Sequence, residues 1–396
     1  MIKRTISEKL RELVLKFPIV AIIGPRQSGK TTLCRNIFPD WKYVSLEDLD
    51  TREFALQDPR GFLATYNKRV IIDEVQRVPH IFSYLQTLVD NGGSPAQFIL
   101  TGSQHIFLLE NVSQTLAGRI AILKLLPLSL EELKNTPYEL SRCEEYIFKG
   151  FYPRIYDQDI APIDWYPNYI QTYVERDVRL MKNIGDLNTF QRFIKMCAAR
   201  VGQILNLSSL GNDCGITHNT VKSWLSLLEA SYIVFFLRPY YKNFNKRLVK
   251  MPKLYFYDCG LVCSLLGIRD VPQMEIHYLK GGLFESFVVS EIIKQGFNRG
   301  VDLSCYYWRD KTGNEIDCII EEGTRLLPIE IKSGKTIIDD FFDGLRYWER
   351  LAGRENTNPY LIYGGEKSQK RTLANLLSWK DIASVLASQI PNLKQS

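Results

Sequence analysis

The chain has 396 residues, with 50 Lys and Arg against 44 Asp and Glu, which gives a formal net charge of +6. Apolar residues make up 45% and charged residues 24%, the balance of a globular protein of two or three domains, so collagen-like and long disordered chains are excluded. No run approaches the roughly 18 apolar residues that span a bilayer, and the charged N-terminus lacks the apolar core of a signal peptide. We therefore expect a cytoplasmic protein without membrane segments.

The first part of the chain alternates apolar runs with helical patterns. Residues 1–17 have the spacing of an amphipathic helix, which Pro18 ends. Runs typical of buried parallel strands follow at 19–23, 70–72, 97–100 and 120–123, with helical stretches near 30–38, 79–91 and 105–117. This alternation predicts an α/β fold with a doubly wound parallel sheet, and we place this domain at residues 1–138.

A phosphate-binding motif follows the first predicted strand. Residues 24–31 read GPRQSGKT, which fits GxxxxGK[ST] between a strand and a helix, the setting that this motif requires. Glycines let backbone N–H groups wrap a phosphate, the lysine reaches the β- and γ-phosphates, and the threonine hydroxyl binds Mg²⁺. The expected ATP-binding residues are Gly24, Gln27, Ser28, Gly29, Lys30, Thr31 and Thr32.

Two acidic residues follow the strand at 70–72. We expect Asp73 to hold Mg²⁺ through water and Glu74 to polarise the attacking water, as in an ATPase rather than a kinase. A solvated strand end is the alternative for this pair taken alone. Small polar residues end the strand at 97–100, and in such sheets this strand lies between the other two, so Thr101 or Ser103 is a candidate γ-phosphate sensor.

Arg119 ends the helical stretch at 105–117 and suits an arginine finger. A compensating charge at a helix C-terminus is the alternative. The sequence leaves open whether Arg119 acts on its own subunit or on a neighbour, and therefore whether the chain forms a homo-oligomer.

The middle of the chain reads as two further segments. Residues 139–200 are helical and rich in aromatic residues, and we expect a helical lid. In 201–275, two short helices are joined by a turn that contains Gly215, the second starting near Thr217, as in a helix-turn-helix. The following residues 238–253 carry six basic residues and no acid where a β-wing is expected.

The ordered blocks GPRQSGKTT, IIDEVQRVP, ILTGSQ, LAGR, GFYPR, YVERDV, GQILN, TVKSWLSLLEASYIVFFLRPY, NKRLVKMPKLYFYDCGL, FES, EIDCII and PIEIKSG run almost end to end. In these blocks the chain resembles prokaryotic AAA+-type ATPases that carry a C-terminal domain of unknown function with a restriction-endonuclease-like core. The resemblance implies ATP and Mg²⁺ as cofactors, and a multidomain α/β protein with a P-loop core, helical lid, winged helix and PD-(D/E)xK-like domain.

The chemistry of the C-terminal residues also predicts a site independently of the resemblance. We expect the nuclease-like domain at 276–365, and the amphipathic pattern at 373–386 predicts a helical tail over 366–396. Asp317 on one strand and Glu330 and Lys332 on the next are the arrangement of restriction-type nucleases, in which the acids bind Mg²⁺ and the lysine stabilises the transition state. Glu285 is the candidate extra acid. Cross-strand salt bridges are the alternative.

Two functional hypotheses follow from these features. In the first, ATP turnover repositions a DNA-binding winged helix and a nuclease-like domain that cuts with Mg²⁺. In the second, the chain is a nucleotide-gated scaffold that binds a protein or DNA without cutting. The expected nucleic-acid contacts are Lys222, Lys242, Lys246, Arg247 and Lys250, for which a solvated charged face is the alternative. Eight scattered cysteines without a CxxC pair predict free thiols and no zinc site.

Overall fold

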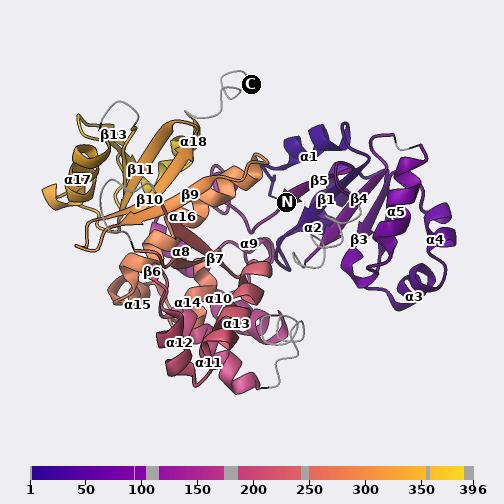
Figure 1. The fold of residues 1–396 in the computed structure, drawn as a ribbon, viewed down its shortest axis with the longest axis horizontal. Coiled ribbons are helices and arrows are strands. Elements are labelled where there is room, and N and C mark those ends of the chain that lie inside the picture. Colours follow the sequence, from indigo (N-terminus) through magenta and orange to yellow (C-terminus); the bar gives the residue numbers. More distant parts are fainter. Residues whose placement is uncertain are drawn as a thin grey trace. The chain divides into compact units, whose positions relative to one another are not determined.

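The computed structural model describes residues 2–92, 94–103, 116–173, 186–241, 249–353 and 357–387. The chain divides into two compact units (Figure 1). Unit 1 is Met1–Leu128 with Ala230–Tyr232 and Phe297–Val301, and unit 2 is Ser129–Glu229, Ile233–Gly296 and Asp302–Ser396.

Unit 1 is built on a five-stranded sheet. Its elements are α1 (Ser7–Val14), β1 (Ile19–Ile23), α2 (Lys30–Ile37), β2 (Lys42–Ser45), α3 (Leu49–Gln57), α4 (Pro59–Thr65), β3 (Val70–Asp73), the 3₁₀ helix η1 (Val75–Arg77), α5 (Ile81–Asp90), β4 (Phe98–Gly102) and β5 (Ile120–Lys124). The strands are all parallel in the order β2-β3-β4-β1-β5. As expected, β4 lies between β1 and β3, so the carboxyl ends of all three strands meet at one edge.

Apolar burial explains this arrangement. Every residue of β1 is buried, because helices cover both faces of the sheet (Figure 1). On one face, α1 and α2 pack on alternate strand residues. The shared core is Ile6, Leu10, Val14, Leu33 and Cys34 of the helical side with Val20, Ile22, Ile71, Ile99, Ala121, Leu123 and Leu125 of the strand side.

The predicted strands of unit 1 are confirmed, and the differences lie in less periodic segments. The helix predicted over 1–17 is shorter, at Ser7–Val14. Three elements were not predicted: α3, α4 and β2, a four-residue strand whose first two residues are exposed. The helical stretch at 105–117 lies almost entirely outside the described residues.

Unit 2 combines helices with one large sheet. Its helices are α7 (Leu130–Leu133), α8 (Cys143–Lys149), α9 (Pro153–Asp157), α10 (Pro162–Tyr169), α11 (Leu187–Ala198), α12 (Leu207–Cys214), α13 (His218–Ala230), α14 (Cys259–Leu265), α15 (Val271–Ile276), α16 (Lys280–Asn298), α17 (Asp343–Ala352), α18 (Ser384–Ala387) and the 3₁₀ helices η3 (Asp339–Phe342) and η4 (Trp379–Asp381). Its strands are β6 (Gln203–Ile204), β7 (Val234–Pro239), β8 (Lys253–Phe256), β9 (Ser304–Arg309), β10 (Glu315–Glu322), β11 (Arg325–Lys332), β12 (Tyr360–Tyr363), β13 (Gln369–Lys370) and β14 (Asn375–Ser378).

All nine strands of unit 2 join one sheet in the order β13-β14-β12-β11-β10-β9-β7-β8-β6. The link between the predicted wing and the predicted C-terminal domain is the parallel pairing of β7 with β9, in which Arg238 lies opposite Tyr306. The strands of the predicted segments 201–275 and 276–365 therefore share one sheet, and these segments and 139–200 belong to unit 2 apart from residues 230–232 and 297–301. Their division into separate domains stays a prediction.

Two predictions for unit 2 have different outcomes. The expected helix-turn-helix pattern is present as α12 and α13, joined through Gly215 in the left-handed conformation (φ 71°). The helical tail predicted over 366–396 is wrong for its described residues. There β14 pairs in parallel with β12, so Ala374, Leu376 and Trp379 are buried around a strand and a 3₁₀ turn, and α18 is only one turn long.

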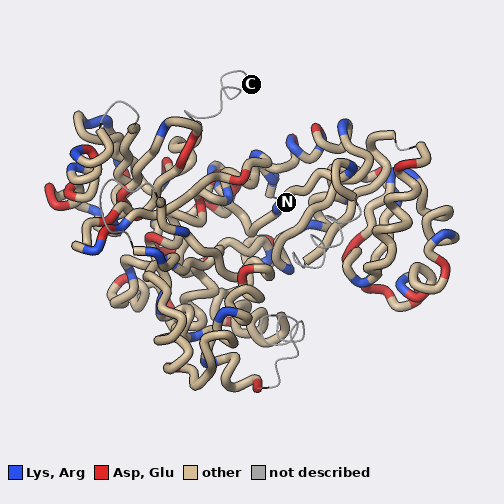
Figure 2. The backbone as a smooth tube through the Cα atoms, in the orientation of Figure 1, with Lys and Arg blue, Asp and Glu red and all other residues tan. Residues whose placement is uncertain are grey.

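The distribution of charged and apolar residues in the structure agrees with the composition of the chain. Lys and Arg are interspersed with Asp and Glu in both units (Figure 2). All eight cysteines are free, and seven of them are buried. Within the described ranges, none of the helices has the length and apolar character needed to cross a bilayer.

Candidate functional site

The motif loop between β1 and α2 has the tight backbone that its glycines predict. Gln27 and Gly29 have positive φ, at 65° and 92°, which aligns the loop with the start of α2. A Cβ atom on Gly24 would lie 2.1 Å from the carbonyl oxygen of Leu125, so only glycine fits there. The loop is therefore packed against the segment that follows β5.

Lys30 lies buried at the first position of α2. Its ammonium donates to the loop's own carbonyl oxygens, at 2.9 Å from Gly24 and 2.7 Å from Pro25. Burial lowers the pKa of Lys30 to about 8, and the nearby Glu74 and Asp73 oppose that shift. The lysine is thus held inside the loop by neutral acceptors.

An N-terminal arginine that the sequence did not single out anchors the same loop. The buried Arg4 guanidinium donates to the carbonyl oxygens of Ser28 and Leu126, each at 2.7 Å. The Ser28 hydroxyl is fully buried and has no hydrogen-bond partner among the described residues. A buried polar atom of this kind in a glycine-rich loop fits a ligand that accepts hydrogen bonds, such as a phosphate.

Asp73 gathers hydroxyl groups from three other elements. Its Oδ2 accepts from Thr31 Oγ1 at 2.9 Å and from the Tyr43 hydroxyl at 2.8 Å, while Oδ1 accepts from the Thr101 hydroxyl. Burial and the negative charge of Asp73 raise the pKa of Tyr43 to about 12. The structure therefore brings Thr31, Asp73 and Thr101 together at the sheet edge, as the motif spacing predicts, and adds Tyr43 of β2.

Glu74 follows β3 in the left-handed conformation, with φ 53°. Its Oε2 accepts from Ser103 Oγ at 3.1 Å and from the Gln76 amide. The predicted sensor Ser103 thus contacts Glu74. Gln76 was missed because nothing in the local sequence distinguishes it from a surface glutamine.

A cavity of about 420 Å³ adjoins these residues on the α2 side. It is lined by Thr31, Thr32, Arg35, Asn36, Phe38, Pro39, Trp41 and Tyr43. The Arg35 guanidinium lies 4.9 Å above the ring of Tyr43. Thr32, predicted as a binding residue, therefore faces a space bordered by aromatic rings and an arginine.

Arg119 lies away from the loop of its own chain. Its guanidinium forms a two-point ion pair with Asp90, with Nε 2.5 Å from Oδ1 and Nη2 3.0 Å from Oδ2. The next residue, Ile120, pairs with Ile19 at the start of β1, whereas the loop follows Ile23 at the other end. Four residues of strand rise about 13 Å, so Arg119 lies at the opposite edge of the sheet.

The predicted C-terminal residues do come together, but around a lysine that the sequence analysis had counted among the basic residues of 238–253. Lys253 of β8 is buried. Its Nζ lies 2.7 Å from Glu285 Oε1 and 3.7 Å from Asp317 Oδ1, and it also pairs with Glu315. Lys253 therefore does not belong to a nucleic-acid surface with the other basic residues of 238–253, because the strand 253–256 is buried throughout.

Glu330 and Lys332 share a face of β11, as period-two alternation predicts. Lys332 Nζ lies 3.0 Å from Glu330 Oε2 and 3.8 Å from Asp317 Oδ2. The second Asp317 oxygen also accepts from the backbone N–H of Ile331 at 2.9 Å. Across the described parts of the chain, no three His, Cys, Asp or Glu side chains are grouped closely enough to hold a metal ion.

The charges in this region depend on one another. Burial raises the pKa of Glu285 to about 7 and raises that of Glu330 well above its usual range. Burial opposes ionisation of Asp317 as well, but Lys253 and Lys332 outweigh it and lower the pKa of Asp317. Lys253 itself stays charged, because Tyr255 and the surrounding acids more than offset its burial and raise its pKa.

The predicted nucleic-acid residues are only partly described. Lys222 is exposed on α13, on the same side as the exposed His218 and Ser226, and Lys250 is exposed before β8. The other three, Lys242, Lys246 and Arg247, lie outside the described residues.

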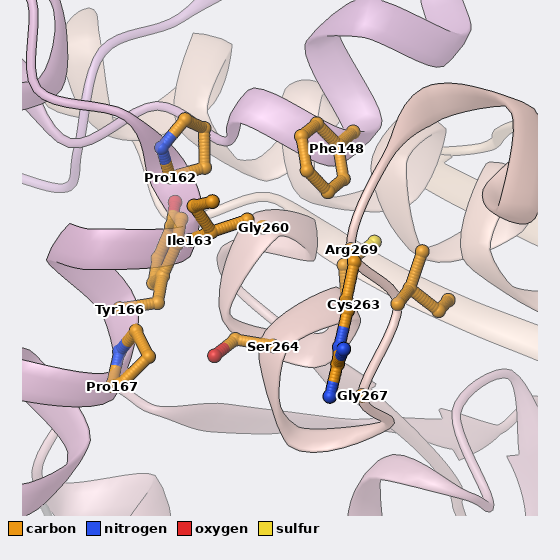
Figure 3. A pocket seen from close by; sticks show the side chains of 11 residues that line it. Phe148, Pro162, Ile163, Tyr166, Pro167, Gly260, Cys263, Ser264, Gly267 and Arg269 are labelled. Atoms are coloured by element: carbon orange, nitrogen blue, oxygen red, sulfur yellow. The ribbon is translucent and has the colours of Figure 1, made fainter.

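Unit 2 also contains a pocket that the sequence did not predict. It has a volume of about 360 Å³ and is lined by residues of α8, α10 and α14 (Figure 3). The rings of Phe148 and Tyr166 and the side chain of Ile163 make it mainly apolar, and Arg269 supplies a charged group.

Three family models match the chain in succession. Residues 16–134 match an AAA domain, residues 140–271 match a domain of unknown function (DUF8612) and residues 280–382 match another domain of unknown function (DUF4143). The first match, the parallel five-stranded sheet and the loop beside Asp73 support an AAA-type ATPase domain in unit 1. At the level of the family, this class suggests nucleotide binding and hydrolysis.

Sequence relatives and solved structures were also compared. Uncharacterized proteins of Mycobacterium tuberculosis and Mycobacterium bovis are each 29% identical over 337 residues, covering 84% of this chain and 74% of theirs. A Walker-type ATPase of Pyrococcus abyssi has a TM-score of 0.40 at 14% identity, over 66% of this chain and 94% of that one. DnaA from Aquifex aeolicus, solved with AMPPCP, has a TM-score of 0.30 at 16% identity, over 57% and 85%.

The packing of Gly24 gives a first prediction. We expect Gly24→Ala to weaken binding of a fluorescent ATP analogue at least about tenfold, because the new Cβ would push the loop away from Leu125. The matched control is Gly92→Ala. Gly92 has a similar φ of 145°, but its Cβ would meet no described atom within 4 Å. Equal affinities of the two variants would show that the close approach at Gly24 does not shape the site.

Proposed function

We propose that this protein is an ATP-hydrolysing switch of the AAA type that couples its nucleotide state to DNA binding by unit 2. The observation that carries the proposal is the meeting of Lys30, the Thr31–Asp73 pair and Glu74 at one edge of the parallel sheet. A triphosphate is the ligand whose charge and length match a glycine-rich loop, a buried lysine and two adjacent acids.

Each group in the loop has a role in this proposal. The backbone N–H groups of residues 26–32 and the Ser28 hydroxyl donate to phosphate oxygens. The Lys30 ammonium exchanges its carbonyl acceptors for the β- and γ-phosphates, and a nearby phosphate favours its charged form. The cavity beside Thr32 offers aromatic and polar groups to the nucleoside.

The acids fit the magnesium ion that AAA-type ATPases use. The Thr31 hydroxyl and the Asp73 carboxylate, 2.9 Å apart, would hold Mg²⁺, which neutralises phosphate charge when it is bound. Glu74 orients and polarises the attacking water. Ser103 and Gln76 fix the carboxylate of Glu74, and Thr101 fixes that of Asp73.

Two substitutions separate binding from turnover. Lys30→Ala should abolish nucleotide binding, since it removes the buried ammonium that lies among the carbonyl oxygens of the loop. Glu74→Gln should retain binding but lower kcat at least about a hundredfold, because the amide cannot act as a base. Equilibrium binding of an ATP analogue and steady-state phosphate release measure the two effects. Normal turnover in Glu74→Gln would refute the role given to Glu74.

We further propose that Arg119 acts on the nucleotide of a neighbouring copy of the chain in a homo-oligomer. Its place at the far edge of the sheet keeps it from its own loop. The bidentate pair with Asp90 holds the guanidinium at the surface until a neighbour's phosphate competes for it.

Mixing inactive variants tests this proposal. Arg119→Ala should lose turnover and keep nucleotide binding. A mixture with Lys30→Ala should regain part of the activity, because the intact Arg119 of one copy serves the intact loop of the other. Asp90→Asn is the control for the loss of the ion pair alone and should stay active. A mixture no more active than its separate components would contradict action between copies.

The DNA-binding surface is assigned to α13 and the residues before β8. The helix buries Val221, Trp224 and Leu228 and exposes the polar groups of His218, Lys222 and Ser226 at a spacing of four residues. An exposed polar stripe with lysines can contact phosphates, which makes binding depend on salt.

Affinity for duplex DNA measured against salt concentration tests this surface. Lys222→Ala and Lys250→Ala should each weaken binding across sequences and reduce the slope of log K against log salt by about 1. Lys134→Ala removes an exposed lysine outside this surface and should leave the slope unchanged. A slope near zero for the unchanged chain would instead favour a protein partner.

A further inference from the structure

The acid cluster of unit 2, which we define as Glu285, Glu315 and Asp317, surrounds the ammonium of Lys253. Glu285 comes from α16, the other two acids from β10, and the lysine from β8. Lys253 is 3% exposed, and all three acids pair with it. The Tyr255 hydroxyl also donates to Glu285 Oε1 at 2.5 Å, so the ammonium is enclosed on several sides.

These residues do not fit a catalytic metal ion. Carboxylates that bind Mg²⁺ approach it to roughly 2.1 Å, and a cation between Glu285 and Asp317 would meet the ammonium that both of them already contact. The second oxygen of Asp317 is held by the N–H of Ile331 and lies 3.8 Å from Lys332. Lys332 in turn pairs with Glu330, so each acid of the predicted nuclease centre has a lysine as its cation.

We propose that Lys253 is the permanent cation of this cluster, and that unit 2 therefore binds its partner without a divalent metal and without cutting it. The lysine belongs to the segment that carries α12 and α13, whereas Glu285 belongs to α16 and the other two acids to the sheet region that follows it. The cluster thus fastens these two parts of unit 2 together, next to the pairing of β7 with β9. This inference is independent of ATP hydrolysis in unit 1.

The proposal makes removal of the lysine informative. Without the ammonium, Glu285 would lose its lysine, whereas Glu315 keeps Arg309 at 2.9 Å and Asp317 keeps Lys332 at 3.8 Å. Three acids would then share fewer cations, which is costly for partly buried carboxylates. A hard divalent ion in the place of the ammonium would find carboxylate oxygens as ligands once these side chains move closer together. A metal should therefore bind the Lys253→Ala variant and partly restore its stability, whereas the unchanged chain should do neither.

The experiment uses the full chain without nucleotide and Mn²⁺ as the probe, with binding followed by calorimetry. Any Mn²⁺ that the unchanged chain binds should still bind to the Asp317→Asn variant. Lys253→Ala should bind Mn²⁺ at least about tenfold more tightly than the unchanged chain, and Lys253→Ala/Asp317→Asn should lose the gain. In thermal unfolding, Mn²⁺ should raise the midpoint of Lys253→Ala and leave that of the double variant unchanged.

Lys335→Ala is the matched control, because it removes another lysine–glutamate pair of unit 2, Lys335 with Glu144 at 2.8 Å, without opening a cluster of acids. It should gain no Mn²⁺ binding. If Lys253→Ala does not fold, the unchanged chain still tests the proposal. Mn²⁺ binding there that Asp317→Asn abolishes would overturn the proposal, and so would Mn²⁺-dependent DNA cleavage that Asp317→Asn abolishes.

Discussion

The carboxylate of Asp73 ties the candidate nucleotide site together. In a parallel sheet every strand ends at the same edge, and the order β2-β3-β4-β1-β5 sets β3 beside both β4 and β2. Hydroxyl groups from α2, β2 and β4 therefore reach one acid, although residues 31, 43 and 101 are far apart in the chain. Because the acid is buried and each hydroxyl satisfies one of its lone pairs, the positions of these four elements are coupled.

The left-handed turn at Glu74 separates the tasks of the two acids. Asp73 ends the strand and contacts the helix that follows the loop, whereas Glu74 contacts Ser103 at the end of β4. Thr101 lies in β4 and Ser103 directly follows its last residue, Gly102, so a shift of β4 moves the partners of both acids together. A change at the phosphates can thus reach both carboxylates through one strand, the physical requirement for a switch.

Local patterns in the sequence predicted most of unit 1 and the positions of Lys30, Thr31, Asp73 and Glu74. A motif between a buried strand and a helix has few structural alternatives. Tyr43, Gln76, Arg4 and Lys253 were not predicted, because their roles depend on partners distant in the chain. Lys253 is the clearest case: in sequence it belongs to a basic stretch, and only the pairing of β8 within the sheet places it among acids of α16 and β10.

Two buried lysines of this chain, Lys30 and Lys253, show that the acceptors around an ammonium determine whether it can bind a ligand. Lys30 donates to neutral carbonyl oxygens of a loop whose Ser28 hydroxyl has no partner in the described part of the chain, and burial lowers the pKa of Lys30 to about 8. An anionic ligand offers such an ammonium a stronger, charge-assisted partner. Lys253 already has three carboxylates, and a ligand that drew it away would deprive all three of its charge and leave Glu285 without its lysine. Unit 1 can therefore redirect its lysine to a phosphate, while the lysine of unit 2 is committed to the structure.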